Sequence, residues 1–474
     1  MAVRGLRLKG SGKAVALAPS APGRYHVFLS HAWVTGQDQM RVVKQRLLDI
    51  LPMVHVFLDV DDGQRRVGKG AEVLNRSDKF LLFASDGFFG GIHAPSRPCM
   101  VELLKAVQLG LEMITVLEVE DKHLPLSPSQ LYEQMCKLDQ PVLDVDGTPV
   151  LDPHGQQFPS MYAKWGFVNG LGHVLTEDGL NPNLGALPIA NRLYAKIFPP
   201  NVAPIEWNRI GVFQDISMRQ IAERLLPADL HGKTYLQGEL IHELPKLPPT
   251  SAGKRFHVCC SPHNAGALAY LKEVQAALRL PSLRFTNTMS ELAECERFLI
   301  YLNRDTWRKS PEGFAADVER AMSANMRLLL VHESLGHESL GHDHSSARGA
   351  LPFQDVLVAT PQPLLARGIY QMIAIPLKAG AYRKASHVLF VQELAAPIPP
   401  SSRSSVAMRG SMALGMALPW AAGSIKLLTS ATARKGVGRH PGVVSRATRT
   451  SGSQFARLAE IHLAERRRPY DENL

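Results

Sequence analysis

Ser30, Asp59 and Ser85 each follow a short run of β-branched and aromatic residues. Such runs, bounded by polar or glycine residues, are typical of buried parallel strands. In a doubly wound parallel sheet, ligands lie beyond the carboxyl ends of the strands. We therefore expect these hydroxyl and carboxylate groups on one rim of a sheet, where they can hydrogen-bond to a ligand.

The segment that begins at Asp59 is rich in charge and glycine as far as Gly70. Arg65 and its neighbour Arg66 can pair with a pyrophosphate, and a flexible loop of this kind can close over a substrate. A solvated surface loop is the other interpretation. Neither predicted sheet opens with a Gly-rich phosphate fingerprint of the GxGxxG kind, which argues against a dehydrogenase.

Strands and helices must alternate to place these residues. The apolar runs predict strands at 25–29, 54–58, 80–84 and 113–117, and the unit closes with the segment 205–207. Apolar residues at helical spacing predict helices at 40–51 and 102–111, and a third at 215–226 with Asp215 as its cap. Between about 122 and 200 the pattern is one of turns, which predicts an insertion of loops. The alternation predicts an α/β fold with a doubly wound parallel sheet.

The segments 25–33, 54–62 and 96–103 together resemble a TIR domain. Ser96, Cys99, Glu102 and Leu103 match the motif Ser-x-x-Cys-x-x-Glu-Leu, in which TIR enzymes carry their catalytic glutamate. The resemblance covers most of residues 24–118 and, less closely, 205–226. It departs from the family at Pro98, where TIR domains commonly have tryptophan.

This resemblance implies a flavodoxin-like sheet and NAD glycohydrolase activity gated by self-association. Glu102 would be the catalytic residue. NAD would be the substrate, with no further cofactor, and its binding residues would be Ser30, Trp33, Asp59, Arg65 and Cys99. One carboxylate can suffice, because nicotinamide leaves a cationic ring as a neutral molecule and needs no general acid.

Three other interpretations remain open. Glu102 can be a solvated glutamate in the first turn of a helix, and Trp33 can simply cap the core. The whole protein can be a signalling scaffold that binds other TIR domains without chemistry.

A second copy of the pattern follows. Residues 255–261 repeat 24–30 at an offset of 231, and 331–333 repeat 116–118 at an offset of 215, which aligns Asp317 with Glu102. A further echo pairs 353–356 with 213–216. Because the second copy lacks the charged loop after its second strand, we expect a TIR-like fold without catalytic apparatus, used for packing or binding.

The predicted organisation is a disordered leader (1–21), a TIR domain (22–227), a linker (228–252), a degenerate TIR-like domain (253–393) and a disordered basic tail (394–474). Residues 401–474 contain 12 Lys/Arg and 4 Asp/Glu, and so carry most of the net charge of +10. A solvated end explains this charge. The alternative is an anionic surface such as nucleic acid or acidic lipid as partner.

The five cysteines are odd in number and lie in apolar sequence, which favours reduced thiols and a cytoplasmic protein. Four histidines between His332 and His344 lie in a tandem Glu-Ser-Leu-Gly-His repeat. We interpret this repeat as a duplicated loop with adventitious or no metal binding, so that no metal site is predicted.

Overall fold

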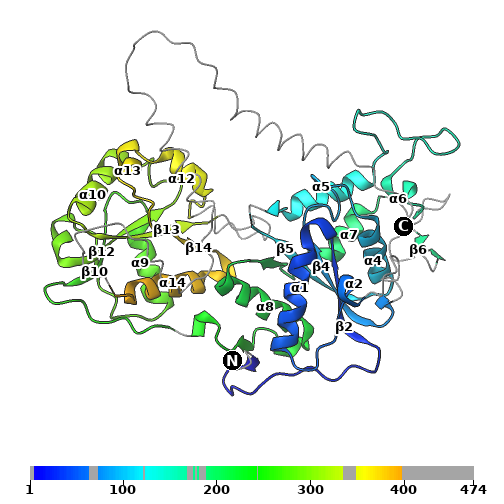
Figure 1. The fold of residues 1–474 in the computed structure, drawn as a ribbon, viewed down its shortest axis with the longest axis horizontal. Helices are drawn as coiled ribbons and strands as arrows, with labels where there is room; N and C mark the ends of the chain where they lie inside the picture. The colour runs from blue at the N-terminus through cyan, green and yellow to red at the C-terminus, as the bar shows by residue number, and fades with distance from the viewer. Residues whose placement is uncertain are drawn as a thin grey trace, which may run out of the picture. The chain divides into compact units, whose positions relative to one another are not determined.

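The protein is described by a computed structural model that covers residues 5–62, 73–120, 123–167, 175–176, 179–180, 188–242, 244–334 and 348–397. Two five-stranded sheets dominate it, with helices on both faces of each (Figure 1). We call the part built on the first sheet the first repeat, and the part built on the second sheet the second repeat. The predicted fold class, two doubly wound α/β units in tandem, is confirmed.

The first sheet has the order β3-β2-β4-β5-β8, and all its strands are parallel. Counted along the chain this is the order 2-1-3-4-5 of flavodoxin-like folds, whose ligands bind between the carboxyl ends of the first and third strands. The four predicted strands are confirmed with changed bounds, and the segment 205–207 forms a fifth. They are β2 (Tyr25–His31), β3 (Val56–Leu58), β4 (Ser77–Ala84), β5 (Glu112–Glu118) and β8 (Ile205–Trp207).

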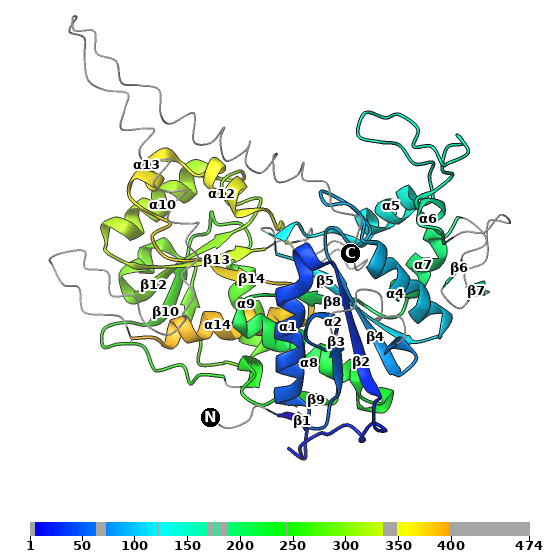
Figure 2. The same ribbon diagram turned by 45° about the vertical axis from the view of Figure 1, so that its right-hand side comes forward.

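Two layers of helices cover this sheet, as Figure 2 shows. On one face lie α1 (Trp33–Ile50) and α8 (Gly211–Leu225), and on the other lie α4 (Arg97–Gln108), α5 (Pro128–Leu138) and α7 (Ala190–Ile197). The apolar residues at helical spacing in α1 form its buried face, since Met40, Val43 and Leu47 are fully buried. The prediction that Asp215 caps the third helix is wrong. Helix α8 begins four residues before Asp215, and Asp215 forms an ion pair with Arg46 of α1.

The predicted insertion of loops is also wrong. Within 122–200 the helices α5, α6 (Met161–Lys164) and α7 bury Leu131, Tyr162 and Leu193 in the core of the first repeat. Asp139 joins two of these helices by accepting a hydrogen bond from the Ala190 amide at 2.7 Å. The turns at Gly147 and Gly155 are present as expected, both with positive φ. Their strong signal hid the helical spacing before them. The short antiparallel pair β6 (Leu175–Thr176) and β7 (Gly179–Leu180) completes this region.

The leader, predicted to be disordered, is ordered from residue 5 onward, and the linker contains regular structure. Strand β1 (Leu6–Leu8) pairs antiparallel with β9 (Thr234–Leu236), and Leu6 and Leu236 are buried in the core beneath α1. The linker also contains the 3-10 turns η2 (Ala228–Leu230) and η3 (Leu240–His242). The pairing was missed because each strand has three residues and its partner lies more than 200 residues away.

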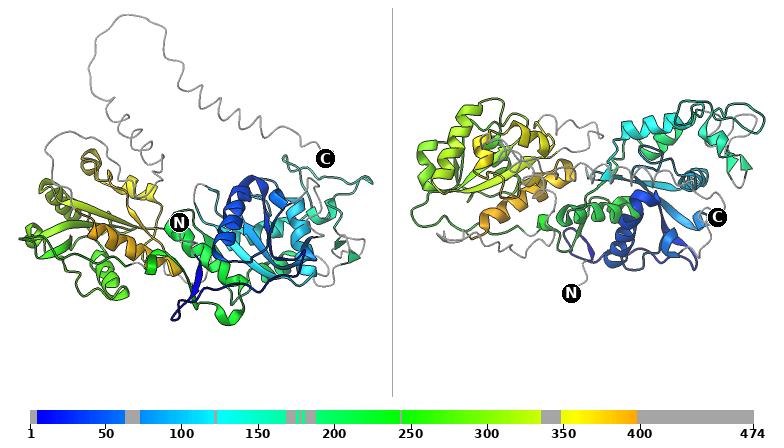
Figure 3. Two further views of the ribbon diagram at one scale, coloured as in Figure 1. Left: turned by 60° about the horizontal axis from the view of Figure 1, so that its bottom comes forward. Right: turned by 45° about the horizontal axis from the view of Figure 1, so that its top comes forward.

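The second sheet repeats the topology, with the order β11-β10-β12-β13-β14 and all strands parallel. Its strands are β10 (Phe256–Cys260), β11 (Phe285–Thr286), β12 (Cys295–Leu302), β13 (Arg327–Glu333) and β14 (Ile375–Leu377). Its helices are α9 (Ala267–Ala277), η4 (Met289–Glu294), α10 (Pro311–Ser323), α12 (Phe353–Ala359), α13 (Gln362–Ala366), η6 (Gly380–Tyr382) and α14 (Arg383–Ala395). Figure 3 shows the yellow helices α12 and α13 and the orange helix α14 on opposite faces of this sheet.

A buried ion pair marks the equivalence of the two repeats. Glu118 ends β5 and accepts a hydrogen bond from Arg209 Nε at 3.1 Å, while Glu333 ends β13 and is bridged by Arg383 at 2.8 and 2.9 Å. Both glutamates are fully or almost fully buried, and both arginines precede or begin the last helix of their repeat. The internal sequence repeat thus corresponds to a repeat of the structure.

The echo between 213–216 and 353–356 is wrong as a structural equivalence. Phe213 lies in the helix after the last strand of its sheet, whereas Phe353 begins α12, which precedes β14. The second repeat also extends beyond the predicted boundary at 393, because α14 continues to Ala395.

The basic tail 401–474 and the stretch 335–347 lie outside the described residues. None of the helices in the described ranges has the length and apolar character needed to cross a bilayer. All five cysteines are described, and none of them forms a disulfide.

Gly36 tests how closely α1 must approach the first sheet. A Cβ at this position would lie 2.9 Å from both His31 Cβ and Phe83 Cδ1. We expect Gly36→Ala to destabilise the protein by about 1–3 kcal/mol, because overpacking a buried contact outweighs the better helix propensity of alanine. The measurement is thermal unfolding followed by circular dichroism.

The matched control is Gly211→Ala, at the start of α8, where a Cβ would meet nothing within 4 Å. This variant should unfold at or slightly above the wild-type temperature. Equal stability of Gly36→Ala and wild type would show that α1 does not depend on this contact.

Candidate active site at the rim of the first sheet

The centre of the candidate site is a hydrogen bond between Ser30 and Glu102. Ser30 Oγ, near the end of β2, donates to Glu102 Oε2 on α4 at 2.6 Å. Ser30 is 1% exposed, and the side chain of Glu102 is partly exposed at the rim. Glu102 Oε1 has no hydrogen-bond partner among the residues that the structure describes. The pair lies beside β4, between the carboxyl ends of the first and third strands.

The start of α4 positions Glu102. Ser96 caps the helix by accepting a hydrogen bond from the Cys99 amide, and Pro98 lies in the first turn. An amide in the first turn has no acceptor within the helix, so proline is well tolerated there. Pro98 therefore helps to begin the helix that carries Glu102.

Cys99 has a positioning role. It is only 3% exposed, and its thiol donates to the backbone carbonyl of His31 at 3.2 Å. Burial, with a contribution from the charge of Glu102, raises the pKa of the Cys99 thiol, so the group stays protonated. The side chain of Cys99, which was predicted to bind substrate, is enclosed between α4 and β2.

Glu102 has a strongly shifted acidity. Burial of its carboxyl raises the pKa of Glu102 to about 8, against the opposing effect of the Ser30 hydrogen bond, and the charge of Asp59 raises it further. Asp59 follows β3 directly and begins the short helix α2 (Asp59–Asp62), and burial raises its pKa as well. Ser30 and Asp59 thus lie at one rim, as the strand pattern predicted, and Glu102 joins them from α4.

Trp33 is the first residue of α1 and is 57% exposed. It does not cap the core, so that interpretation is wrong. Thr35 ties this end of the helix to the end of β4 through hydrogen bonds of 2.7 Å to Ser85 Oγ and to the Asp86 carbonyl. An aromatic ring is therefore held at the rim with its surface open to a ligand.

Asp86 and His93 were missed by the sequence analysis. Asp86 is buried and accepts hydrogen bonds from the amides of Ile92 and His93 at 2.8 and 3.1 Å, and it also bonds the His93 ring. A Cβ at Gly91 would lie 2.0 Å from Asp86 Oδ1, so only glycine fits there. The glycine pair that follows the strand was the signal that could have revealed this ordered loop.

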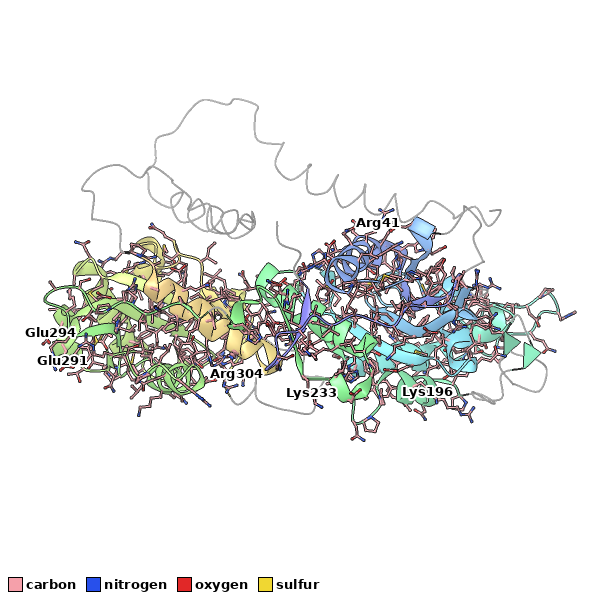
Figure 4. The ribbon with its side chains drawn as sticks, turned by 90° about the horizontal axis from the view of Figure 1, so that it is seen from below. Arg41, Lys196, Lys233, Glu291, Glu294 and Arg304 are labelled. Atoms are coloured by element: carbon pink, nitrogen blue, oxygen red, sulfur yellow. The ribbon has the colours of Figure 1, made fainter. Side chains whose placement is uncertain are left out.

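The charged loop is described only at its start. Arg65, Arg66 and the glycines at 63 and 68 lie outside the described residues. Asp61 is paired with Arg41 at 3.3 Å and with Lys44 at 3.6 Å, and Arg41 is labelled in Figure 4. The start of the loop is therefore bound to α1.

The histidine run is described at one residue only. His332 lies in β13, and its Nε2 is 2.9 Å from the Leu351 carbonyl. Burial lowers the pKa of His332 to about 4, which identifies it as a core residue. The other three histidines of the run lie outside the described ranges, and within those ranges no three His, Cys, Asp or Glu residues gather as a metal ion would require.

No protein-family model matches the chain, and no curated protein matches its sequence.

Glu102→Gln should change how stability depends on pH. Because the folded pKa is raised to about 8, the folded state keeps a proton that the unfolded state releases near pH 4.5, and wild-type stability falls as pH rises between these values. Glutamine is neutral throughout. We expect Glu102→Gln to match wild type near pH 4 and to be more stable at pH 9, by an amount on the order of 1–3 kcal/mol.

The measurement is chemical unfolding at pH 4 to 9. Glu319→Gln, which changes an exposed glutamate on α10, controls for the loss of a helix charge. A stability difference between Glu102→Gln and wild type that does not vary with pH would contradict the raised pKa.

Proposed function

We propose that the first repeat hydrolyses NAD at the bond between nicotinamide and ribose, with Glu102 as the catalytic residue. The observation that carries this proposal is the Ser30–Glu102 pair at the rim, with one carboxylate oxygen left for a ligand. The proposal also draws on the resemblance of the motif from Ser96 to Leu103 to that of TIR enzymes.

The reaction does not require a proton to be donated to the leaving group. The bond between ribose C1′ and the ring nitrogen breaks, and its electron pair returns to nicotinamide, which leaves as a neutral molecule. A water oxygen then bonds to C1′ and releases its proton to solvent. A fixed carboxylate near the ribose stabilises the positive charge that develops on the sugar. Ser30 holds the Glu102 carboxylate in place for this role.

The ionisation state of Glu102 fits a cationic substrate. With a pKa of about 8, the free enzyme holds much of Glu102 protonated at neutral pH. The positive nicotinamide ring favours the ionised carboxylate when it binds nearby. The exposed ring of Trp33 would stack on the substrate, Asp59 would contact its hydroxyls and Arg65 its pyrophosphate. Substrate binding would thus favour the ionised Glu102 carboxylate that the reaction needs.

Self-association is part of the proposal. Trp33 and Val34 are both well exposed at the start of α1, next to the site. Exposed apolar neighbours of this kind favour contact with another copy. This observation also supports the second candidate function, a TIR-like scaffold without chemistry.

The direct test is nicotinamide release from NAD by the full chain at low and high protein concentration. We expect release that rises steeply with concentration, and a loss of at least about 100-fold in kcat for Glu102→Gln, since one charge-stabilising group is removed. Glu319→Gln should keep wild-type turnover. A folded Glu102→Gln protein with near-full turnover would overturn the role of Glu102. Oligomers without any nicotinamide release would favour the scaffold.

A pH profile probes the same residue. We expect kcat/KM to rise with pH through about 8, because the free enzyme must ionise Glu102. Ser30→Ala removes a hydrogen bond that favours the ionised form, so its profile should shift to higher pH. A flat profile, or a shift of Ser30→Ala to lower pH, would contradict the assignment.

A further inference from the structure

The second repeat keeps the arrangement that it was expected to lack. Ser261 Oγ, directly after β10, donates to Asp317 Oδ2 on α10 at 2.6 Å. The distance equals that of the Ser30–Glu102 bond, and the offsets of 231 and 215 align the same residues. Both pairs lie between the carboxyl ends of the first and third strands of their sheets. The second repeat thus carries a serine–carboxylate pair of its own.

A histidine extends this second pair. His263 Nδ1 lies 2.9 Å from Asp317 Oδ2, and the His263 amide donates to Ser261 Oγ at 2.9 Å. The ring lies against Gly313 of α10, where a Cβ would be 3.0 Å from His263 Cγ. The imidazole is therefore held by one hydrogen bond to Asp317 and by close packing, and the backbone of His263 is held by Ser261, while the His263 side chain remains 47% exposed.

The cluster leaves polar atoms for a ligand. The Asp317 side chain is only 13% exposed, and both hydrogen bonds that it receives go to Oδ2. In the described part of the chain, neither Asp317 Oδ1 nor His263 Nε2 has a hydrogen-bond partner. One oxygen of the Asp317 carboxylate and one ring nitrogen of His263 are thus available for hydrogen bonds. Two such neighbouring groups suit a ligand with neighbouring hydroxyl groups.

We propose that Ser261, His263 and Asp317 form a second nucleotide-binding site, which recognises the hydroxyls of a ribose. Hydrogen bonding of a ribose hydroxyl to an acidic side chain at the carboxyl rim is a recurrent mode of nucleotide binding. Arg304, labelled in Figure 4, is exposed two residues after β12 on the same rim and supplies positive charge for a phosphate. A bare anion is a poor ligand here, because it would meet the Asp317 carboxylate.

This site binds its nucleotide without cleaving it. Asp317 is one methylene shorter than Glu102, and His263 shares the carboxylate oxygen that Ser261 contacts. The residue that follows the second strand is Asn287, where the first repeat has Asp59. The choice of ADP-ribose as probe rests on the proposed function, since it is the expected product of the first site.

The test measures the stoichiometry of ADP-ribose binding to the full chain by isothermal titration calorimetry. We expect two sites in wild type, and loss of one in Asp317→Asn while nicotinamide release continues. Asp355→Asn, which changes an exposed aspartate on α12, should keep both sites. His263→Gln provides a second variant in case Asp317→Asn unfolds, and it should weaken the same site at least tenfold. ADP should compete at this site at least tenfold better than its 2′,3′-dideoxy analogue.

The outcomes separate the two proposals. Binding that neither Asp317→Asn nor His263→Gln alters would overturn the second site, whatever the first repeat does. Binding that depends on Asp317, in a protein that releases no nicotinamide, would support the second site and remove the proposed hydrolase. Equal competition by ADP and by the dideoxy analogue would overturn ribose recognition.

Discussion

The first strand of each sheet, β2 in the first repeat and β10 in the second, pairs in parallel with a neighbour on either side. The rest of each repeat depends on this pairing, because it satisfies both edges of the strand, leaves its two faces to be covered by helices, and brings the carboxyl ends of three strands to one edge of the sheet. The chain reverses its winding direction at this strand and opens a crevice beside it. A side chain at the strand end therefore lies in a ligand-binding position through topology alone.

In both repeats, a serine at the end of this strand forms a hydrogen bond with a carboxylate. In the first repeat the carboxylate belongs to a partly buried Glu102 near a second acid, Asp59, and the pKa of Glu102 is raised to about 8. Such a group is costly to ionise unless a positive charge lies nearby. In the second repeat Asn287 stands where the first repeat has Asp59, and a histidine, His263, contacts the carboxylate. One backbone arrangement thus supports two different electrostatic environments.

Local pattern was sufficient for the strands, the buried face of α1 and the repeat, because all three have short periods or direct self-similarity. The sequence pattern did not reveal elements that pair with a distant segment or that lie beside strong turn signals. Strand β1 depends on a partner at Thr234–Leu236, and the helices within 122–200 lie beside strong turn signals. The Asp86–His93 contact was also missed, since it depends on the path of a loop that bends back through three glycines with positive φ.

The sequence by itself determined the α/β class, the central strands of the first sheet and the residues that follow them, because apolar periodicity and strand ends are local properties. It also identified Glu102 as the residue of interest. Only the tertiary structure decided that Glu102 bonds Ser30, that Cys99 is enclosed, that Trp33 is open and that Asp317 retains the same bond in the second repeat. These properties depend on how a helix packs over a strand that is distant in the chain, and on the burial that this packing imposes on a charge.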